Sequence, residues 1–185
     1  MKQLAALLLA SVLAGTVAAQ SAPPLRFVAA TNNALPIAAF DADERLVGGI
    51  AKDLGELIAA GLGRPVQFVS LPARQVSAAL VAGEADAICF VLPEWLHGDF
   101  RWTRGLIPEA IVVAAHANAP GLVGLNGLAR EPVGTVEGYS YPRAERALGR
   151  PLKRMDAPSM TANMRQLAAG HVRYAIVEKT ALQYF

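Results

Sequence analysis

Short apolar runs that alternate with segments of helical periodicity are the feature that most constrains what this chain can fold into. The mostly apolar run at residues 25–30 predicts a buried strand, and residues 66–71 and 85–92 predict two further strands. Between them, residues 48–62 and 72–82 carry apolar side chains at three- and four-residue spacings, which predicts two helices. Because strand and helix alternate, the sequence favours an α/β layer built on a largely parallel sheet.

A second unit of the same plan follows the first. Residues 107–115 form another apolar run, and the glycine-rich stretch 118–127 is where the residues favour a change of domain. Strands are then predicted at 132–136, 152–155 and 174–177, with helices at 141–148 and 159–170. The chain ends at Phe185, where another helix is beginning. We therefore expect a fragment of a longer protein.

The first nineteen residues have the pattern of a secretory signal peptide. Lys2 gives the positive start, residues 4–13 give the apolar run, and residues 17–19 give a small-residue cleavage site. The apolar run is shorter than the ~20 residues that a membrane span usually needs. We expect residues 1–19 to be removed and the mature protein to work in the periplasm.

Composition excludes several classes of function. Without residues 1–19 the chain carries sixteen basic and fifteen acidic side chains, with no basic stripe for nucleic acid or lipid headgroups. Cys89 is the single cysteine, so no internal disulfide is possible. The sequence has no nucleophile elbow, phosphate-binding loop or zinc motif. We expect a monomer without metal or cofactor.

Three short sequence motifs, in this order along the chain, resemble those of a known family. Residues 46–54 resemble an "L-x-G-[FI]-x-x-D-L" entry to a helix, and residues 82–88 resemble a "G-x-x-D-[AV]" turn into a strand. Residues 133–136 supply a later strand of the same plan. With this order the chain resembles the family 3 extracellular solute-binding proteins, the periplasmic receptors of polar amino-acid uptake systems.

The resemblance implies a two-lobed, type II periplasmic-binding-protein fold. Each lobe would hold a mostly parallel sheet flanked by helices, and a hinge would let the lobes close on a small ligand. Residues 20–109 would form lobe one, and residues 110–185 would form lobe two with the hinge strand at its start. In the family the chain returns to complete lobe one. No return segment follows here, so the resemblance implies truncation at the C-terminus.

Lobe one offers five candidate contacts with a ligand, because such folds bind ligands beyond the carboxyl ends of strands. Thr31 and Asn32 follow the first strand, where the family often carries an acidic residue. Residues 92–95 take the place of the family's "T-P-E-R" motif, so Trp95, next to Glu94, stands where the family presents an arginine to the ligand's carboxylate. Trp95 would cover an apolar part of the ligand or pack the lobe edge. Arg74 would replace the missing arginine or be a solvated residue at a helix start.

Lobe two offers the other candidates. Gly138, Tyr139 and Ser140 align with the turn that holds the ligand's carboxylate in the family, while Ser140 is also a natural helix cap. The simpler interpretation of this turn is a capped helix. Glu178 ends the last strand, where the family places an aspartate that meets the ligand's ammonium group. Its alternative is a surface ion pair with Lys179.

Three functions remain open from the sequence. The leading one is a periplasmic receptor that captures a small polar solute, an amino acid or a related zwitterion or anion, for the membrane permease of an ABC transporter. The second is an enzyme like the periplasmic cyclohexadienyl dehydratases, which also resemble this family, with Glu178 or Glu94 as the cleft carboxylate. The third is the ligand-sensing module of a signalling protein.

Overall fold

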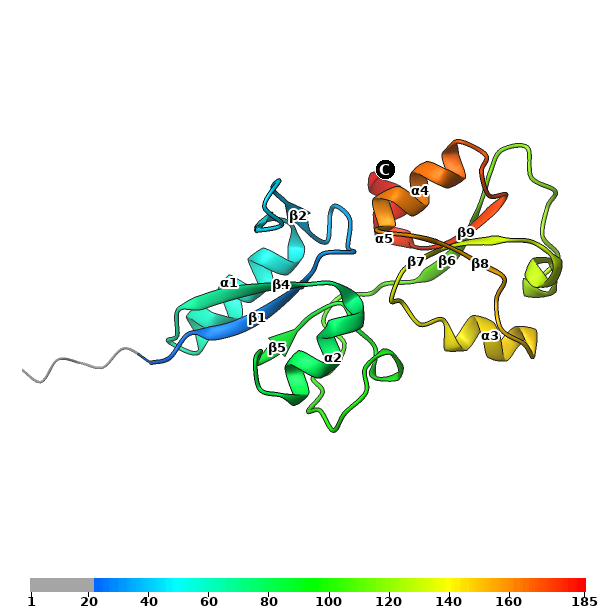
Figure 1. The fold of residues 1–185 in the computed structure, drawn as a ribbon. Coiled ribbons are helices and arrows are strands. Elements are labelled where there is room, and N and C mark those ends of the chain that lie inside the picture. Colours follow the sequence, from blue (N-terminus) through cyan, green and yellow to red (C-terminus); the bar gives the residue numbers. More distant parts are fainter. Residues whose placement is uncertain (1–21) are drawn as a thin grey trace, which may run out of the picture.

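The computed structural model describes residues 22–185. The predicted signal peptide, residues 1–19, lies outside the described residues. Figure 1 shows two lobes side by side, with the first part of the chain, blue to green, in one and the last part, yellow to red, in the other.

Lobe one is built on a parallel three-stranded sheet in the order β4-β1-β5. Its strands are β1 (Leu25–Ala30), β4 (Val66–Leu71) and β5 (Ala87–Ile88). Central β1 is buried at five of its six residues, as expected for a strand covered on both faces. The predicted strand at 85–92 is wrong in length. Phe90 has a φ of 59°, which ends the extended backbone, and a 3₁₀ turn, η1 (Pro93–Trp95), follows.

A short hairpin of lobe one was not predicted. Strands β2 (Ala39–Phe40) and β3 (Leu46–Gly48) pair antiparallel just before the first helix. Two and three residues are too few for a period-two pattern to stand out in the sequence.

Helices α1 (Ile50–Gly61) and α2 (Ala73–Val81) accompany this sheet. The predicted apolar face of α1 is partly wrong, because Leu57 and Leu62 are 69% and 57% exposed. The helix instead buries three small residues spaced four apart, Ala51, Gly55 and Ala59. A Cβ added at Gly55 would lie 2.6 Å from Cε1 of Phe68 on β4. The small residues therefore let α1 approach the sheet closely.

Lobe two holds a four-stranded sheet in the order β6-β9-β7-β8. Its strands are β6 (Ile111–Ala115), β7 (Val133–Val136), β8 (Arg154–Ala157) and β9 (Tyr174–Glu178). Strand β6 is antiparallel to β9, and the other pairs are parallel. Strands β7 and β9 are buried along their whole length.

The helical segments of lobe two are η2 (Leu125–Arg130), α3 (Pro142–Leu148), α4 (Met160–Ala168) and α5 (Lys179–Tyr184). The η2 turn lies partly in the glycine-rich stretch 118–127, where a change of domain was predicted. Ser159 caps α4, since its hydroxyl accepts a hydrogen bond from the N–H of Ala162 at 3.2 Å.

The two lobes, their mostly parallel sheets and the flanking helices confirm the predicted fold class. The lobe boundary at residues 109 and 110 and the hinge role of β6 stay predictions. None of the helices within residues 22–185 has the length and apolar character that a membrane crossing requires.

Candidate functional site

A cleft of about 540 Å³, part of it open to solvent, is lined by residues of both lobes. Most lining residues of lobe one are apolar, and the full set from that lobe is Ala30, Asn33, Ala73, Val76, Ile88, Cys89, Phe90, Val91, Trp95 and Leu96. Lobe two contributes Gly138, Tyr139, Ser140 and Glu178. A smaller hollow continues from Trp95 and Glu178 toward Ile176 and Met160 in lobe two.

Several of the lining residues lie at or just after the carboxyl ends of parallel strands. Ala30 is the last residue of β1, and Glu178 is the last residue of β9. The turn at 138–140 comes directly after β7, and Cys89 directly after β5. Strand ends of the two lobes therefore meet at the cleft, as the sequence predicted.

Glu178 is the only acidic residue among the residues that line the cleft. It is 8% exposed, and this burial raises its pKa from the ordinary 4.5 to about 7. The backbone N–H of Glu178 lowers the pKa, while the nearby Glu109 adds to the rise.

The carboxylate of Glu178 has no charged partner within residues 22–185, and no hydrogen bond from another residue in that range reaches it. The alternative of a surface pair with Lys179 is wrong, because Glu178 is buried and Lys179 is exposed without an ion pair to it. An ionised carboxylate at this position is costly, and either a bound proton or a cation that enters the cleft relieves that cost.

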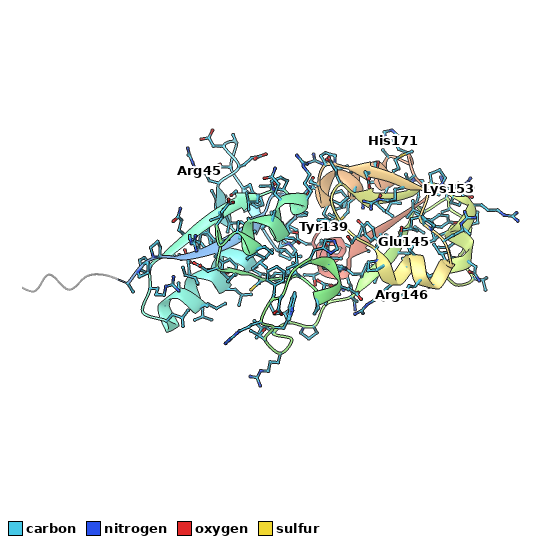
Figure 2. The ribbon with its side chains drawn as sticks, turned by 60° about the horizontal axis from the view of Figure 1, so that its bottom comes forward. Arg45, Tyr139, Glu145, Arg146, Lys153 and His171 are labelled. Carbon is cyan, nitrogen blue, oxygen red and sulfur yellow. The ribbon has the colours of Figure 1, made fainter. Side chains whose placement is uncertain are left out.

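Tyr139 lies between the two lobes (Figure 2). Its hydroxyl donates a hydrogen bond to Oδ1 of Asn33 in lobe one at 2.6 Å. Burial, and then the nearby Glu178, raise the pKa of Tyr139 well above its ordinary value. The phenol therefore stays protonated, with its proton directed at Asn33.

Arg154 positions the turn that carries Tyr139. Its guanidinium donates to the carbonyl oxygens of Tyr139 at 2.9 Å and of Val136 at 2.8 Å, and it pairs with Asp156 at 2.7 Å. It also lies over the ring of Tyr141, whose hydroxyl accepts from the N–H of Val136. Sequence reasoning missed Arg154, because the carbonyls that it binds are brought to it only by folding.

Ser140 lines the cleft but does not cap a helix. The N-cap of α3 is Tyr141, no side chain caps that end, and Pro142 opens the helix. The predicted cap is therefore wrong, because Tyr141 and not Ser140 holds the N-cap position. Gly138 has a φ of +77°, and a Cβ there would lie 3.0 Å from the backbone nitrogen of Arg74. The turn thus needs glycine to approach lobe one.

Asn32 joins the lobes and is not part of the cleft lining. It is 6% exposed, and its Nδ2 donates to the carbonyl of Pro158 in lobe two at 2.7 Å. Its Oδ1 accepts from the N–H of Ala73 at 2.6 Å, and its carbonyl accepts from the N–H of Met160 at 2.8 Å. The neighbouring Thr31 also lies outside the lining, and its N–H donates to Leu71.

Arg74 and Glu94 also link the lobes. Arg74 pairs with Glu137 at 3.1 Å, and both side chains are exposed. Glu94 pairs with Arg143 at 2.6 Å and with Arg146 at 3.4 Å, both on α3. Neither Arg74 nor Glu94 lines the cleft.

Of the predicted ligand-binding residues, the structure thus gathers Trp95, Gly138, Tyr139, Ser140 and Glu178 at the cleft. Cys89 joins them, and burial raises the pKa of its thiol, which keeps it protonated. Within residues 22–185, His, Cys, Asp and Glu side chains nowhere gather in threes as metal ligands.

Comparisons with known proteins agree on the fold. A scan against protein-family models finds no match, and a search of curated protein sequences finds none. Among solved structures, an ancestral arginine-binding protein bound to glutamine matches with a TM-score of 0.65 and 21% identity, over 87% of this chain and 72% of that one. An ancestral amino-acid-binding protein, a precursor of cyclohexadienyl dehydratase, matches with a TM-score of 0.68 and 17% identity, over 87% and 72%.

A third solved structure is the substrate-binding protein of an ABC uptake transporter from Streptococcus pneumoniae with bound histidine. It matches with a TM-score of 0.66 and 12% identity, over 88% of this chain and 68% of that one. At sequence identities this low, the matches establish a shared fold and nothing further. The chain has the two-lobed type II fold of amino-acid-binding and ABC substrate-binding proteins.

Proposed function

We propose that this chain is a solute-binding protein that closes its lobes on a small solute with an amino group. It would work in the periplasm, where the predicted signal peptide would send it, and would deliver the solute to the membrane permease of an ABC transporter. The observation that carries the proposal is the buried, unpaired carboxylate of Glu178 in a cleft between two lobes. The fold likeness to proteins described as binding arginine, glutamine or histidine supports it.

Contacts across the lobes also support closure as the working motion. Asn32, Tyr139 and Glu94 each bond to the opposite lobe through groups at the edge of the cleft. Such bonds favour a closed form that would exclude water from a bound solute. A hinge that opens them would let the solute in and out.

A thermal-shift panel tests the proposal. The purified protein would be screened against amino acids, polyamines, small carboxylates and cyclohexadienyl acids. A solute at ~100 times its dissociation constant should add about 2.7 kcal/mol to stability. Binding without consumption of the solute is the expected result, and a folded protein that binds no member of the panel would contradict the proposal.

A dehydratase is the second candidate function. Two observations favour it: a carboxyl with a pKa of about 7 suits proton transfer near neutral pH, and one solved neighbour is described as a precursor of cyclohexadienyl dehydratase. Consumption of a cyclohexadienyl acid by the native protein, abolished in Glu178→Gln, would decide for the enzyme. Under the receptor proposal the same substitution weakens affinity and there is no turnover to lose.

A further inference from the structure

The charges along the cleft are unequal. The fourteen lining residues include one acidic side chain, Glu178, and no lysine, arginine or histidine. An amino acid would bring a carboxylate as well as an ammonium group, and a desolvated carboxylate needs a cation or several donors of its own.

The arginines beside the cleft are already engaged. Arg74 pairs with Glu137, and Arg143 and Arg146 both pair with Glu94. Arg154 is held by Asp156 and by two backbone carbonyls behind the turn. Binding of a solute carboxylate by Arg74 or Arg154 would leave Glu137 or Asp156 without its cation, while Arg143 and Arg146 share Glu94.

Beside the N–H donors of Asn33 and Trp95, the polar side chains of the cleft offer three acceptors. The hydroxyl of Tyr139 donates its hydrogen bond to Asn33, so only its lone pairs remain for a solute in the cleft. Ser140 can accept through its hydroxyl, and Glu178 accepts through its carboxylate. An ammonium group has three N–H donors, the same number as these acceptors.

The remaining wall suits hydrocarbon. Val76, Ile88 and Leu96 pack together in lobe one and line the cleft along with Trp95. Apolar surface of a solute is stabilised there because it is removed from water. The indole also favours a cation near its ring face.

We propose that the cleft selects small apolar primary amines that carry no carboxylate, with Glu178 as counter-charge and Trp95 in the apolar wall. This inference rests on the proposed solute-binding function and names its class of solute. One ammonium group would neutralise Glu178, whereas a zwitterion would return a negative charge to a site that already feels Glu109.

Isothermal titration of the full chain with matched sets of solutes tests the inference. One set is isoamylamine, leucine and 4-methylpentanoate, and the other is phenethylamine, phenylalanine and 3-phenylpropanoate. Within a set the hydrocarbon is constant and only the charged groups change. In at least one set the amine should bind at least ten-fold tighter than the amino acid, with no measurable binding of the acid.

The outcomes separate the two proposals. If an amino acid binds tighter than its amine, or if only solutes outside both sets bind, the inference is overturned and the solute-binding function stands. If no solute of any class binds a folded protein, the proposed function itself fails.

Two variants of the cleft test whether the amine binds at Glu178. Glu178→Gln should weaken amine binding by at least about 30-fold, as expected for loss of one partner of a buried charge pair. Ser140→Ala changes an exposed residue of the cleft and should weaken it by about 10-fold, through the loss of a hydrogen bond to a charged group. Glu56→Gln, on the exposed face of α1, is the control and should leave affinity unchanged. An amine that binds both cleft variants as tightly as the native protein would overturn the inference.

Discussion

Replacing Glu178 by glutamine should make the unliganded protein more stable at neutral and alkaline pH. Folding raises the pKa of this carboxyl from 4.5 to about 7, chiefly by burial. The folded state therefore holds a proton that the unfolded state releases, and stability falls as pH rises from about 4.5 through about 7. At about 1.4 kcal/mol for each pH unit, the complete loss is about 3 kcal/mol. Glutamine has nearly the same shape and no charge, so it avoids this loss.

The assay is urea unfolding of the native protein and of Glu178→Gln, followed by far-UV circular dichroism at pH 4.5, 6, 7 and 8. The two should agree within about 1 kcal/mol at pH 4.5, and the variant should be more stable by about 3 kcal/mol at pH 8. Glu56→Gln, at an exposed site, controls for the loss of a surface charge and should show no such trend. The reasoning is refuted if Glu178→Gln follows the native pH profile or is less stable at pH 8.

Three further predictions concern residues outside the cleft lining. Asn32→Ala should lower the free energy of unfolding by about 2 to 4 kcal/mol, since it leaves the Pro158 carbonyl and the Ala73 N–H unpaired; urea denaturation checks this, and a loss below 1 kcal/mol would contradict it. Glu94→Gln should cost less than about 1 kcal/mol, because its arginine partners are exposed, and it should reduce the salt dependence of solute affinity; an unchanged salt dependence would count against a role in closure. Gly49→Ala should lower the melting temperature, because Gly49 has a φ of +97° and a new Cβ would lie 2.7 Å from the Ile37 carbonyl; Gly61→Ala, with nothing within 4 Å, is the control, and equal melting temperatures would contradict the account.

The sequence predicted the strands of the fold better than their lengths. Strands β1 and β4 match their predicted bounds, because a mostly apolar run of six residues marks each; β1 is central and buried, whereas β4 is an edge strand and only half-buried. Strand β5 is short because the backbone of Phe90 adopts the left-handed region. Phenylalanine rarely adopts that conformation, so the residue type does not predict it. The face of α1 was misjudged for a related reason: leucine usually marks the buried side, but close packing on Phe68 selects Gly55 instead.

The candidate site was predictable where it depends on strand ends. Trp95, Tyr139 and Glu178 line the cleft because they stand at or just after the carboxyl ends of strands or their turns. Asn32 and Arg74 stand at similar positions, yet they bond across to the other lobe. A side chain at a strand end either faces the solute or bonds to the other lobe, depending on how closely the turns of the two lobes approach each other. A single sequence does not reveal that distance.

The most direct test of the account is the titration of the Glu178 carboxyl itself, followed by ¹³C NMR and assigned from the spectrum of Glu178→Gln. The account predicts a pKa of about 7 in the free protein and a marked fall once phenethylamine or isoamylamine saturates the cleft, because the ammonium group favours the charged carboxylate. A carboxyl that titrates near 4.5 in the free protein, or one whose pKa does not move when the amine is bound, would contradict the claim that Glu178 is the counter-charge of the solute.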